Sequence, residues 1–114
     1  METPDMPLNL PTAIECYFEI DKTDDLERFS ECFAPKAEVI DEERIHTGIA
    51  AIQNWAREAK AATNYHVTPL SADVGEIEAI VTGQVEGNFP GSPVTLRYFF
   101  TLEAGLIIAL EIKP

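Results

Sequence analysis

From Tyr65 to Val85 the chain reads YHVTPLSADVGEIEAIVTGQV, and here the spacing of apolar residues changes from that of helices to that of strands. Upstream they recur every three or four positions, whereas from Tyr65 onward they tend to alternate with polar residues. Over 76–86 the alternation separates two faces, one with Ile77, Ala79, Val81 and Val85, the other with Glu76, Glu78, Thr82 and Gln84. The pattern continues over 94–103 and 106–112, so four strands are predicted from residue 65 onward.

Three helices are predicted before this point, over 9–21, 24–34 and 48–62. Asp24 would cap the second helix and Pro35 would end it, while Gly48 would open the third. Two short strands are expected between them, over 37–41 and within 42–47. The apolar faces of the three helices carry Leu10, Ile14, Tyr17 and Phe18, then Leu26, Phe29 and Phe33, then Ile49, Ile52, Trp55, Ala56 and Ala59.

Helices followed by a run of strands are typical of an α+β fold. A long antiparallel meander twists and curls, and helices laid across its concave side would close a cone with an internal pocket. We therefore predict a single α+β domain over 9–114, in which three N-terminal helices pack on a curved, mostly antiparallel sheet. Residues 1–8 are predicted to form a flexible tail, and Pro69 indicates an edge strand or a bulge.

The chain is strongly acidic, with 20 Asp and Glu against 8 Lys and Arg and a net charge of −12. This charge repels phosphate backbones and anionic membrane surfaces, and no basic cluster offsets it, so nucleic-acid and membrane binding are not expected. Cys16 and Cys32 lack the spacing of metal ligands and are predicted to be buried free thiols. Together with the absence of a signal peptide, they favour a cytoplasmic protein.

The order of these elements and several short motifs resemble the nuclear transport factor 2-like superfamily, which includes ketosteroid isomerases and SnoaL-type polyketide cyclases. The resemblance covers residues 9–113. It is carried by LPTA at 10–13, AEVID at 37–41, IHTG at 45–48, NYHVT at 64–68, FPGSP at 89–93 and LEAGLI at 102–107. It implies the cone fold but leaves the function open, because this fold hosts enzymes, binding modules and transport factors.

The resemblance also implies roles for three residues. In the ketosteroid isomerase pattern, the position of Asp41 holds the carboxylate that shuttles a proton, and the position 24 residues upstream, here Tyr17, holds a tyrosine that donates to the oxyanion. The pattern places a protonated carboxylic acid near the position of Tyr98, where this chain offers a second phenol instead. The expected catalytic set is therefore Asp41 as base with Tyr17 and Tyr98 as donors.

Five apolar or aromatic side chains are predicted to line the pocket: Ile14, Phe18, Phe33, Trp55 and Phe100. The same residues also suit a packed core. His46 and His66 are open to several interpretations, as a base, a metal ligand, or polar residues of a turn and of the sheet rim. No HxxxH spacing is present, so neither a metal nor a cofactor is expected.

Two functions remain open at this point. The first is an acid/base enzyme of the isomerase, cyclase or dehydratase type, acting on an apolar carbonyl-bearing substrate. The second is a non-catalytic module for binding a hydrophobic ligand, or no ligand, or for dimerisation. It predicts that the pocket is filled by Phe18, Phe33, Trp55 and Phe100 and that Asp41 points outward. A homodimer through the outer sheet face is also expected, because Ile80, Phe99 and Ile107 are predicted to expose an apolar patch there.

Overall fold

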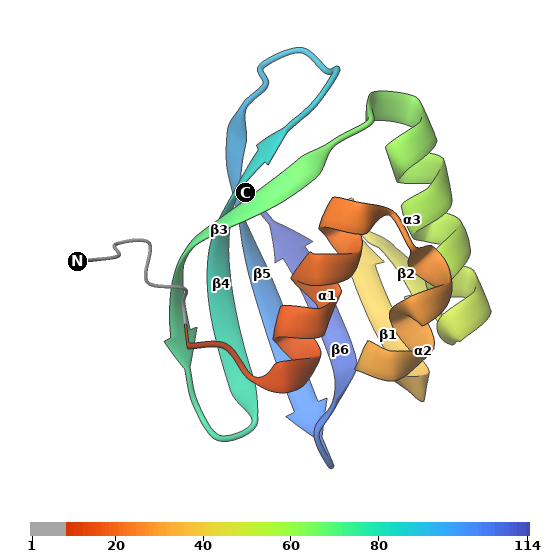
Figure 1. Ribbon diagram of the computed structural model, residues 1–114, viewed down its shortest axis with the longest axis vertical. Coiled ribbons are helices and arrows are strands. Elements are labelled where there is room, and N and C mark those ends of the chain that lie inside the picture. The colour runs from red at the N-terminus through yellow and green to blue at the C-terminus, as the bar shows by residue number, and fades with distance from the viewer. Residues whose placement is uncertain (1–8) are drawn as a thin grey trace.

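A six-stranded sheet organises the computed structural model, which describes residues 9–114 (Figure 1). The predicted tail over 1–8 lies outside the described residues. The strand order is β2-β1-β6-β5-β4-β3. Only β1 and β6 pair in parallel among these strands, so the sheet is mostly antiparallel as predicted. The strands are β1 (Phe33–Asp41), β2 (Arg44–Thr47), β3 (His66–Val74), β4 (Glu78–Glu86), β5 (Val94–Glu103) and β6 (Leu106–Lys113).

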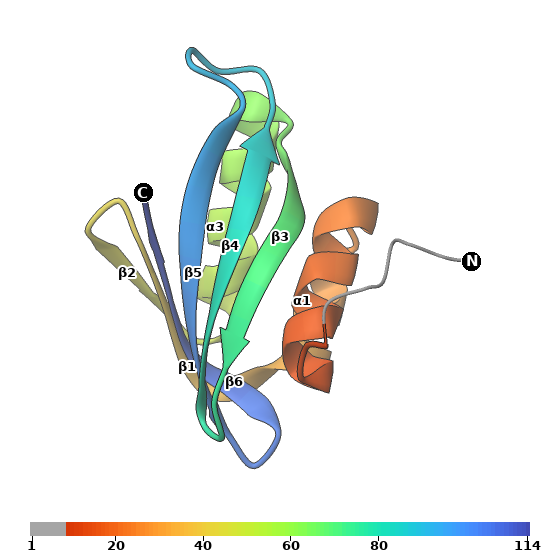
Figure 2. The same ribbon diagram turned by 90° about the vertical axis from the view of Figure 1, so that its left-hand side faces the viewer.

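The sheet curves without closing, and the helices lie on its concave face (Figures 1 and 2). Helix α1 (Thr12–Thr23) contacts β3 and β6, whereas α3 (Ile49–Thr63) contacts β1 and β2. The space between the helices and the sheet is filled by a packed hydrophobic core that includes Ile14, Phe33, Val39, Ile52, Val81, Phe100, Ile107 and Leu110. This arrangement confirms the predicted α+β cone. Within residues 9–114 no helix is both long and apolar enough to cross a membrane.

Helices α1 and α3 fall within three residues of their predicted bounds. Pro11 and Gly48 precede them, and Asp24 and Asn64 end them in the left-handed conformation, with φ of 59° and 50°. Asp24 therefore ends α1, whereas the sequence predicts that it caps the next helix.

The second helix is much shorter than the predicted 24–34. It consists of a 3-10 turn, η1 (Leu26–Arg28), and one α-helical turn, α2 (Phe29–Cys32). The chain is already extended at Phe33, which pairs with Ile107 of β6. Pro35 therefore lies inside β1, in a stretch where the register with β6 shifts. Phe29 and Phe33 still point inward, as the apolar spacing predicted.

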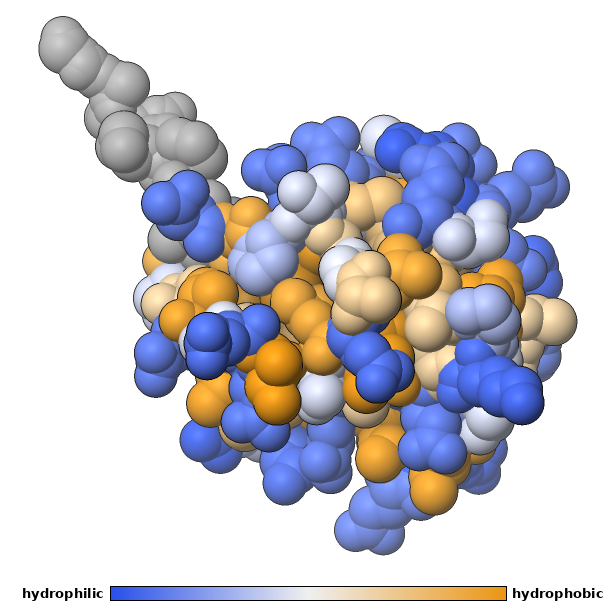
Figure 3. Space-filling model, turned by 90° about the horizontal axis from the view of Figure 1, so that it is seen from below, coloured by the Kyte–Doolittle hydropathy of each residue, from blue (hydrophilic) through white to orange (hydrophobic). Residues whose placement is uncertain are grey.

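Strand β3 fulfils both expectations for Pro69, since it is an edge strand and its register with β4 shifts between Pro69 and Ser71. Two other positions differ from prediction. Ile77 precedes β4 and is 61% exposed. Ile107, expected on the outer face, is fully buried because the β5–β6 register shifts between Thr101 and Leu102. At the lower end of the molecule, where β3 turns into β4, hydrophilic residues separate the apolar ones (Figure 3).

Lys60 of α3 joins three elements. Its Nζ lies 2.8 Å from Asp21 Oδ1 and donates to the backbone oxygens of Asp21 and Tyr65 at 2.8 and 2.7 Å. The other carboxylate oxygen of Asp21 accepts a hydrogen bond from Val67 N–H at 2.7 Å. The end of α1, the last turn of α3 and the start of β3 are thereby tied together by one buried ion pair.

The connection between β4 and β5 is held against the same region. Asn88 N–H donates to Thr63 O at 2.7 Å. A Cβ added to Gly87 would lie 2.8 Å from both Thr63 O and Tyr65 Cα, closer than real Cβ contacts come, so only glycine fits at this position.

Candidate functional site

A cavity of about 590 Å³ lies among α3, the β1–β2 hairpin and strands β4 and β5. Its apolar wall includes Trp55, Ala59, Ala62, Val85, Phe89, Val94, Leu96 and Ile112. Polar groups converge on it from several elements: Asp41, Glu42, Arg44, His46, Glu58, Thr63, Tyr65 and Tyr98. A mostly apolar cavity with a few fixed polar groups is the usual form of a small-molecule site.

Asp41 faces this cavity from the end of β1. It follows the inward-facing Ala37 and Val39 at the strand period of two, and both of those residues are buried. Trp55 Nε1–H donates a hydrogen bond to Asp41 Oδ2 at 3.0 Å. The carboxylate is half-buried and held in one orientation by the helix opposite, instead of pointing outward as the non-catalytic interpretation predicts.

Tyr98 lies on the cavity wall, at the centre of β5. It is 2% exposed, and burial, followed by the nearby Tyr65, Asp21 and Asp41, raises its pKa well above the ordinary tyrosine value. Burial and the same two aspartates, with Asp24, also raise the pKa of Tyr65. Both phenols are therefore neutral at physiological pH, and each keeps a proton to donate to an oxygen atom in the cavity.

Tyr17 is placed differently from its two expected partners. It is 4% exposed and is not among the residues that line the cavity. Its ring packs against Phe29 at 5.9 Å, Phe100 at 5.7 Å and Tyr98 at 6.4 Å between centroids. Burial raises its pKa as well, so Tyr17 is a neutral phenol directly behind the cavity wall.

Of the five residues predicted to line the pocket, Trp55 does so. The other four, Ile14, Phe18, Phe33 and Phe100, pack against one another and against Tyr17 in the core. The reason is that α1 and α2 cover the deep end of the cone, where aromatic rings interlock, for example Phe18 and Phe100 at 5.9 Å. The cavity is therefore confined to the end beneath α3.

Asp41, Trp55 and Tyr98 are the predicted site residues among the sixteen that line the cavity, and His46 and Tyr65 are two of the thirteen that were not assigned to it from the sequence. His46 pairs with Val39 across the β1–β2 hairpin and packs near Trp55, with ring centroids 6.0 Å apart. Directly paired residues share a sheet face, so the inward position of Val39 was the available signal for His46. His66 lies elsewhere, 45% exposed and 3.6 Å from Asp24. Within residues 9–114 no three His, Cys, Asp or Glu side chains are grouped as metal ligands would be.

Comparison with known proteins agrees with this architecture. The family model for the SnoaL-like domain matches residues 14–110. The crystal structure of a proposed polyketide cyclase from Sinorhizobium meliloti is 45% identical in sequence, covers 92% of this chain and 96% of its own, and superimposes with a TM-score of 0.89. No curated protein sequence gives a match.

More distant structures share the fold. A hypothetical protein from Catenulispora acidiphila, with a ketosteroid isomerase-like fold and in complex with trimethylamine, has a TM-score of 0.81 at 16% identity, covering 93% of this chain and 87% of its own. A proposed SnoaL-like polyketide cyclase from Jannaschia sp. has a TM-score of 0.77 at 17% identity, with coverages of 89% and 81%. The chain belongs to the SnoaL-like domain family, a group within the predicted superfamily.

Proposed function

We propose that this protein is a small acid/base enzyme that removes a proton next to the carbonyl of an apolar substrate. Asp41 is the general base, and Tyr98 donates a hydrogen bond to the carbonyl oxygen. The observation that carries the proposal is the hydrogen bond from Trp55 to Asp41, which holds a carboxylate on the wall of a mostly apolar cavity. The 45% identity to a proposed polyketide cyclase supports the same class of chemistry.

The reaction begins when Asp41 takes a proton from the carbon beside the carbonyl. The electron pair of the broken C–H bond forms the enolate, whose oxygen accepts a hydrogen bond from the neutral Tyr98 hydroxyl. Returning the proton to a different carbon completes an isomerisation. Attack of the enolate carbon on a second carbonyl of the same molecule, followed by protonation of the new alkoxide, completes a cyclisation. Loss of a β-hydroxyl group as water completes a dehydration.

Tyr17 is assigned a supporting role in this proposal. It lies behind Tyr98, with ring centroids 6.4 Å apart, and both rings belong to the same buried aromatic cluster. A fixed ring behind Tyr98 limits the positions that the Tyr98 phenol can take. We therefore place Tyr98, and not Tyr17, in contact with the substrate, and expect the working form to be a cytoplasmic homodimer.

The test measures proton removal without needing to know the product. Enolisable ketones that raise the melting temperature of the protein are incubated with it in D₂O, and replacement of their α-protons by deuterium is followed by NMR. The wild-type protein is expected to accelerate this exchange. Asp41→Asn keeps the shape of the side chain but removes the base, and is expected to slow exchange by about 10²- to 10⁴-fold while ligand stabilisation persists.

Glu43→Gln is the matched control, since it makes the same chemical change two residues away on an exposed side chain outside the cavity lining. Its exchange rate is expected to equal that of the wild type. If Asp41→Asn exchanges protons as fast as the wild type, the base assignment is wrong. If ketones bind the wild-type protein but exchange no faster than in buffer, the non-catalytic binding module becomes the better interpretation.

A further inference from the structure

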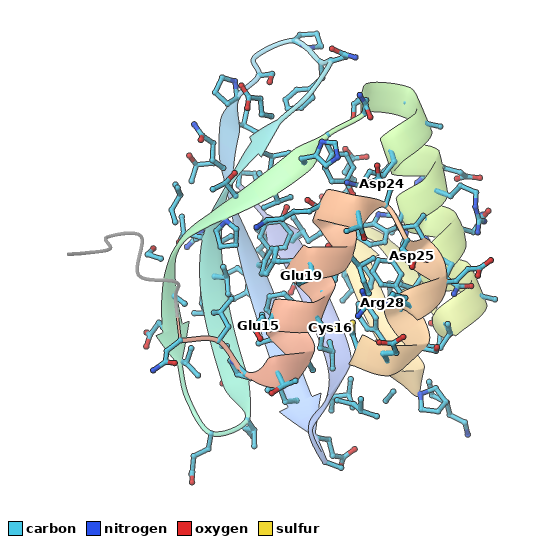
Figure 4. The ribbon with its side chains drawn as sticks, in the orientation of Figure 1. Glu15, Cys16, Glu19, Asp24, Asp25 and Arg28 are labelled. Atoms are coloured by element: carbon cyan, nitrogen blue, oxygen red, sulfur yellow. The ribbon has the colours of Figure 1, made fainter. Side chains whose placement is uncertain are left out.

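The two cysteines, predicted to be buried free thiols, lie in contact where α1 meets α2. Cys32 Sγ donates to Cys16 Sγ at 2.6 Å, although the two residues are 16 positions apart in the chain. Both are free thiols in the structure. Cys16 lies on α1 between Glu15 and Glu19, close to the segment that carries Arg28 (Figure 4).

The two thiols differ in access to solvent. Cys32 is completely buried, whereas Cys16 is half-buried and lines a cleft of about 330 Å³. The cleft is formed by Thr12, Ala13, Glu15, Cys16, Glu19, Arg28, Glu31 and Gly105. A small, uncharged molecule can therefore approach Cys16 from solvent, whereas Cys32 is fully buried and does not line the cleft.

This cleft is separate from the proposed active site. Its lining residues come from α1, the η1–α2 segment and the β5–β6 turn, and it shares none of them with the cavity that holds Asp41. The proposed proton chemistry does not use either sulfur atom, so the cysteine pair needs its own account.

We propose that Cys16 and Cys32 are a peroxide-sensitive dithiol, in which Cys16 is the attacking thiol and Cys32 the resolving one. A thiol that solvent can reach, next to a second cysteine, is the usual arrangement of reversible redox sites. The two sulfur atoms are already in contact, as formation of a disulfide bond between them requires. The product is an intramolecular disulfide that joins α1 to α2.

The chemistry has two steps. Cys16 gives up its proton as its sulfur attacks one oxygen of hydrogen peroxide, the O–O bond breaks, and the departing hydroxide takes up that proton and leaves as water, so that Cys16 becomes a sulfenic acid. Cys32 sulfur then attacks Cys16 sulfur, the S–O bond breaks, and the departing hydroxide takes up the Cys32 proton to form water. Two thiols and one peroxide thus give one disulfide and two waters.

Burial of Cys32 fits the resolving role. The pKa of the Cys32 thiol is raised above its ordinary value, mainly by burial and secondly by the hydrogen bond with Cys16. Cys32 therefore keeps its proton while Cys16 reacts, and loses it only to the leaving hydroxide. Both positions are placed by packing, because Cys32 belongs to the buried core and Tyr17, next to Cys16, does too.

The disulfide should stabilise the fold reversibly, because it restricts the unfolded chain. For a loop of this length, a rise in melting temperature on the order of 10 °C is expected on oxidation, and a reducing agent should abolish it.

The experiment treats reduced full-length protein with hydrogen peroxide, removes the excess, alkylates free thiols under denaturing conditions and measures the intact mass. The expected result is loss of both alkylation sites together, a chain lighter by two hydrogens, no covalent dimer, and full recovery with dithiothreitol. Cys32→Ser should stop at a Cys16 sulfenic acid that dimedone captures. In Cys16→Ser the buried Cys32 should stay alkylatable after peroxide treatment.

Three outcomes would overturn the proposal. They are wild-type protein that keeps both thiols, a product that is an intermolecular disulfide, and Cys16 oxidised beyond sulfenic acid while Cys32 remains free. The melting temperature of each variant in its reduced state shows that it is folded before treatment.

Discussion

Two phenols on the cavity wall, the half-buried Tyr65 and the buried Tyr98, are hydrogen-bond donors of the candidate site, and Tyr17 is a third phenol behind that wall. Burial is the main cause of the raised pKa of Tyr17, Tyr65 and Tyr98, so all three stay protonated at physiological pH. Among the hydrogen bonds between residues 9–114, none involves the Tyr65 or Tyr98 hydroxyl, although both residues line the cavity. A hydroxyl on the cavity wall that is not bonded to another protein group is available to donate to a bound carbonyl oxygen.

Removing one hydroxyl at a time should therefore rank the tyrosines. Tyr98→Phe keeps the ring but deletes the donor, and is expected to slow α-proton exchange by about 10²- to 10³-fold. Tyr17→Phe changes a residue behind the wall and is expected to slow exchange by less than about tenfold. The measurement is the NMR exchange rate at saturating ketone, with circular dichroism to show that both variants are folded.

The reverse order would contradict this assignment. If Tyr17→Phe is the slower variant, Tyr17 is the donor that the family resemblance implied, and the cavity must extend to it when substrate binds. Equal and small effects would remove both phenols from the mechanism.

Few polar side-chain contacts join one element to another, and the buried ion pair of Lys60 and Asp21 is the most enclosed of them. Their side chains are 10% and 6% exposed, whereas Asp24, which also approaches Lys60 at 3.0 Å, is 46% exposed. The pair joins α1, α3 and β3 beside Tyr65, whose ring lies 4.5 Å from Lys60 Nζ. The position of one cavity wall therefore depends on this pair.

Breaking the pair on one side should be costly. Lys60→Met leaves the buried Asp21 carboxylate without its cation, and the free energy of unfolding is expected to fall by about 3 kcal/mol. Lys22→Met makes the same change on an exposed position of α1 and should shift it by less than about 0.5 kcal/mol. Urea unfolding measures both values.

A second variant separates loss of the cation from loss of packing. The double variant Lys60→Met with Asp21→Asn no longer has the uncompensated Asp21 carboxylate, so part of the lost free energy of unfolding should return. A loss for Lys60→Met no larger than that for Lys22→Met would show that the pair does not hold these elements together.

The elements were more predictable than the cavity between them. Periodicity located α1, α3 and the later strands because each of them buries one face, and a buried face gives a regular spacing of apolar residues in the local sequence. The second helix was overestimated because Phe33 satisfies a helical stripe equally well as the first residue of β1, and pairing with β6 decides between them. The cavity lining depends on which end of the cone α1 and α2 fill. The local sequence does not show which end of the cone these helices fill. The sequence therefore predicts Phe18 and Phe100 in the pocket lining, whereas in the structure they belong to the core.

At the scale of the whole molecule, the exposed face of the sheet carries apolar side chains on a strongly acidic chain. Ile80, 37% exposed, pairs with Phe99 across β4 and β5. Arg97 and Lys113 lie 5.6 and 5.5 Å from the Phe99 ring, so cations border the apolar pair. Two chains of net charge −12 repel one another, and this repulsion opposes association through the patch.

We expect a homodimer that depends on this patch and strengthens with salt. Light scattering at micromolar concentration should give twice the 12.6 kDa mass of one chain. The dimer should dissociate less at high ionic strength, because screening weakens the repulsion. Ile80→Glu should produce a monomer, whereas Gln84→Glu, an exposed position on the same face of β4, should not. A wild-type monomer at every salt concentration would remove the dimer from the proposed function.

The close contact at Gly87 has a consequence for how the cavity can be altered. Because the backbone of Gly87 packs against Thr63 and Tyr65, the base of the β4–β5 hairpin is held in place. Phe89 and Val94 lie beyond this base and form part of the cavity wall. Asn88 N–H is bonded to Thr63 O, and Ser92 Oγ accepts a hydrogen bond from Gly87 N–H, so residues 89–91 are the part of this hairpin that can be varied freely. Libraries confined to residues 89–91 would change which molecules enter the cavity while leaving Asp41, Trp55 and the aromatic core untouched.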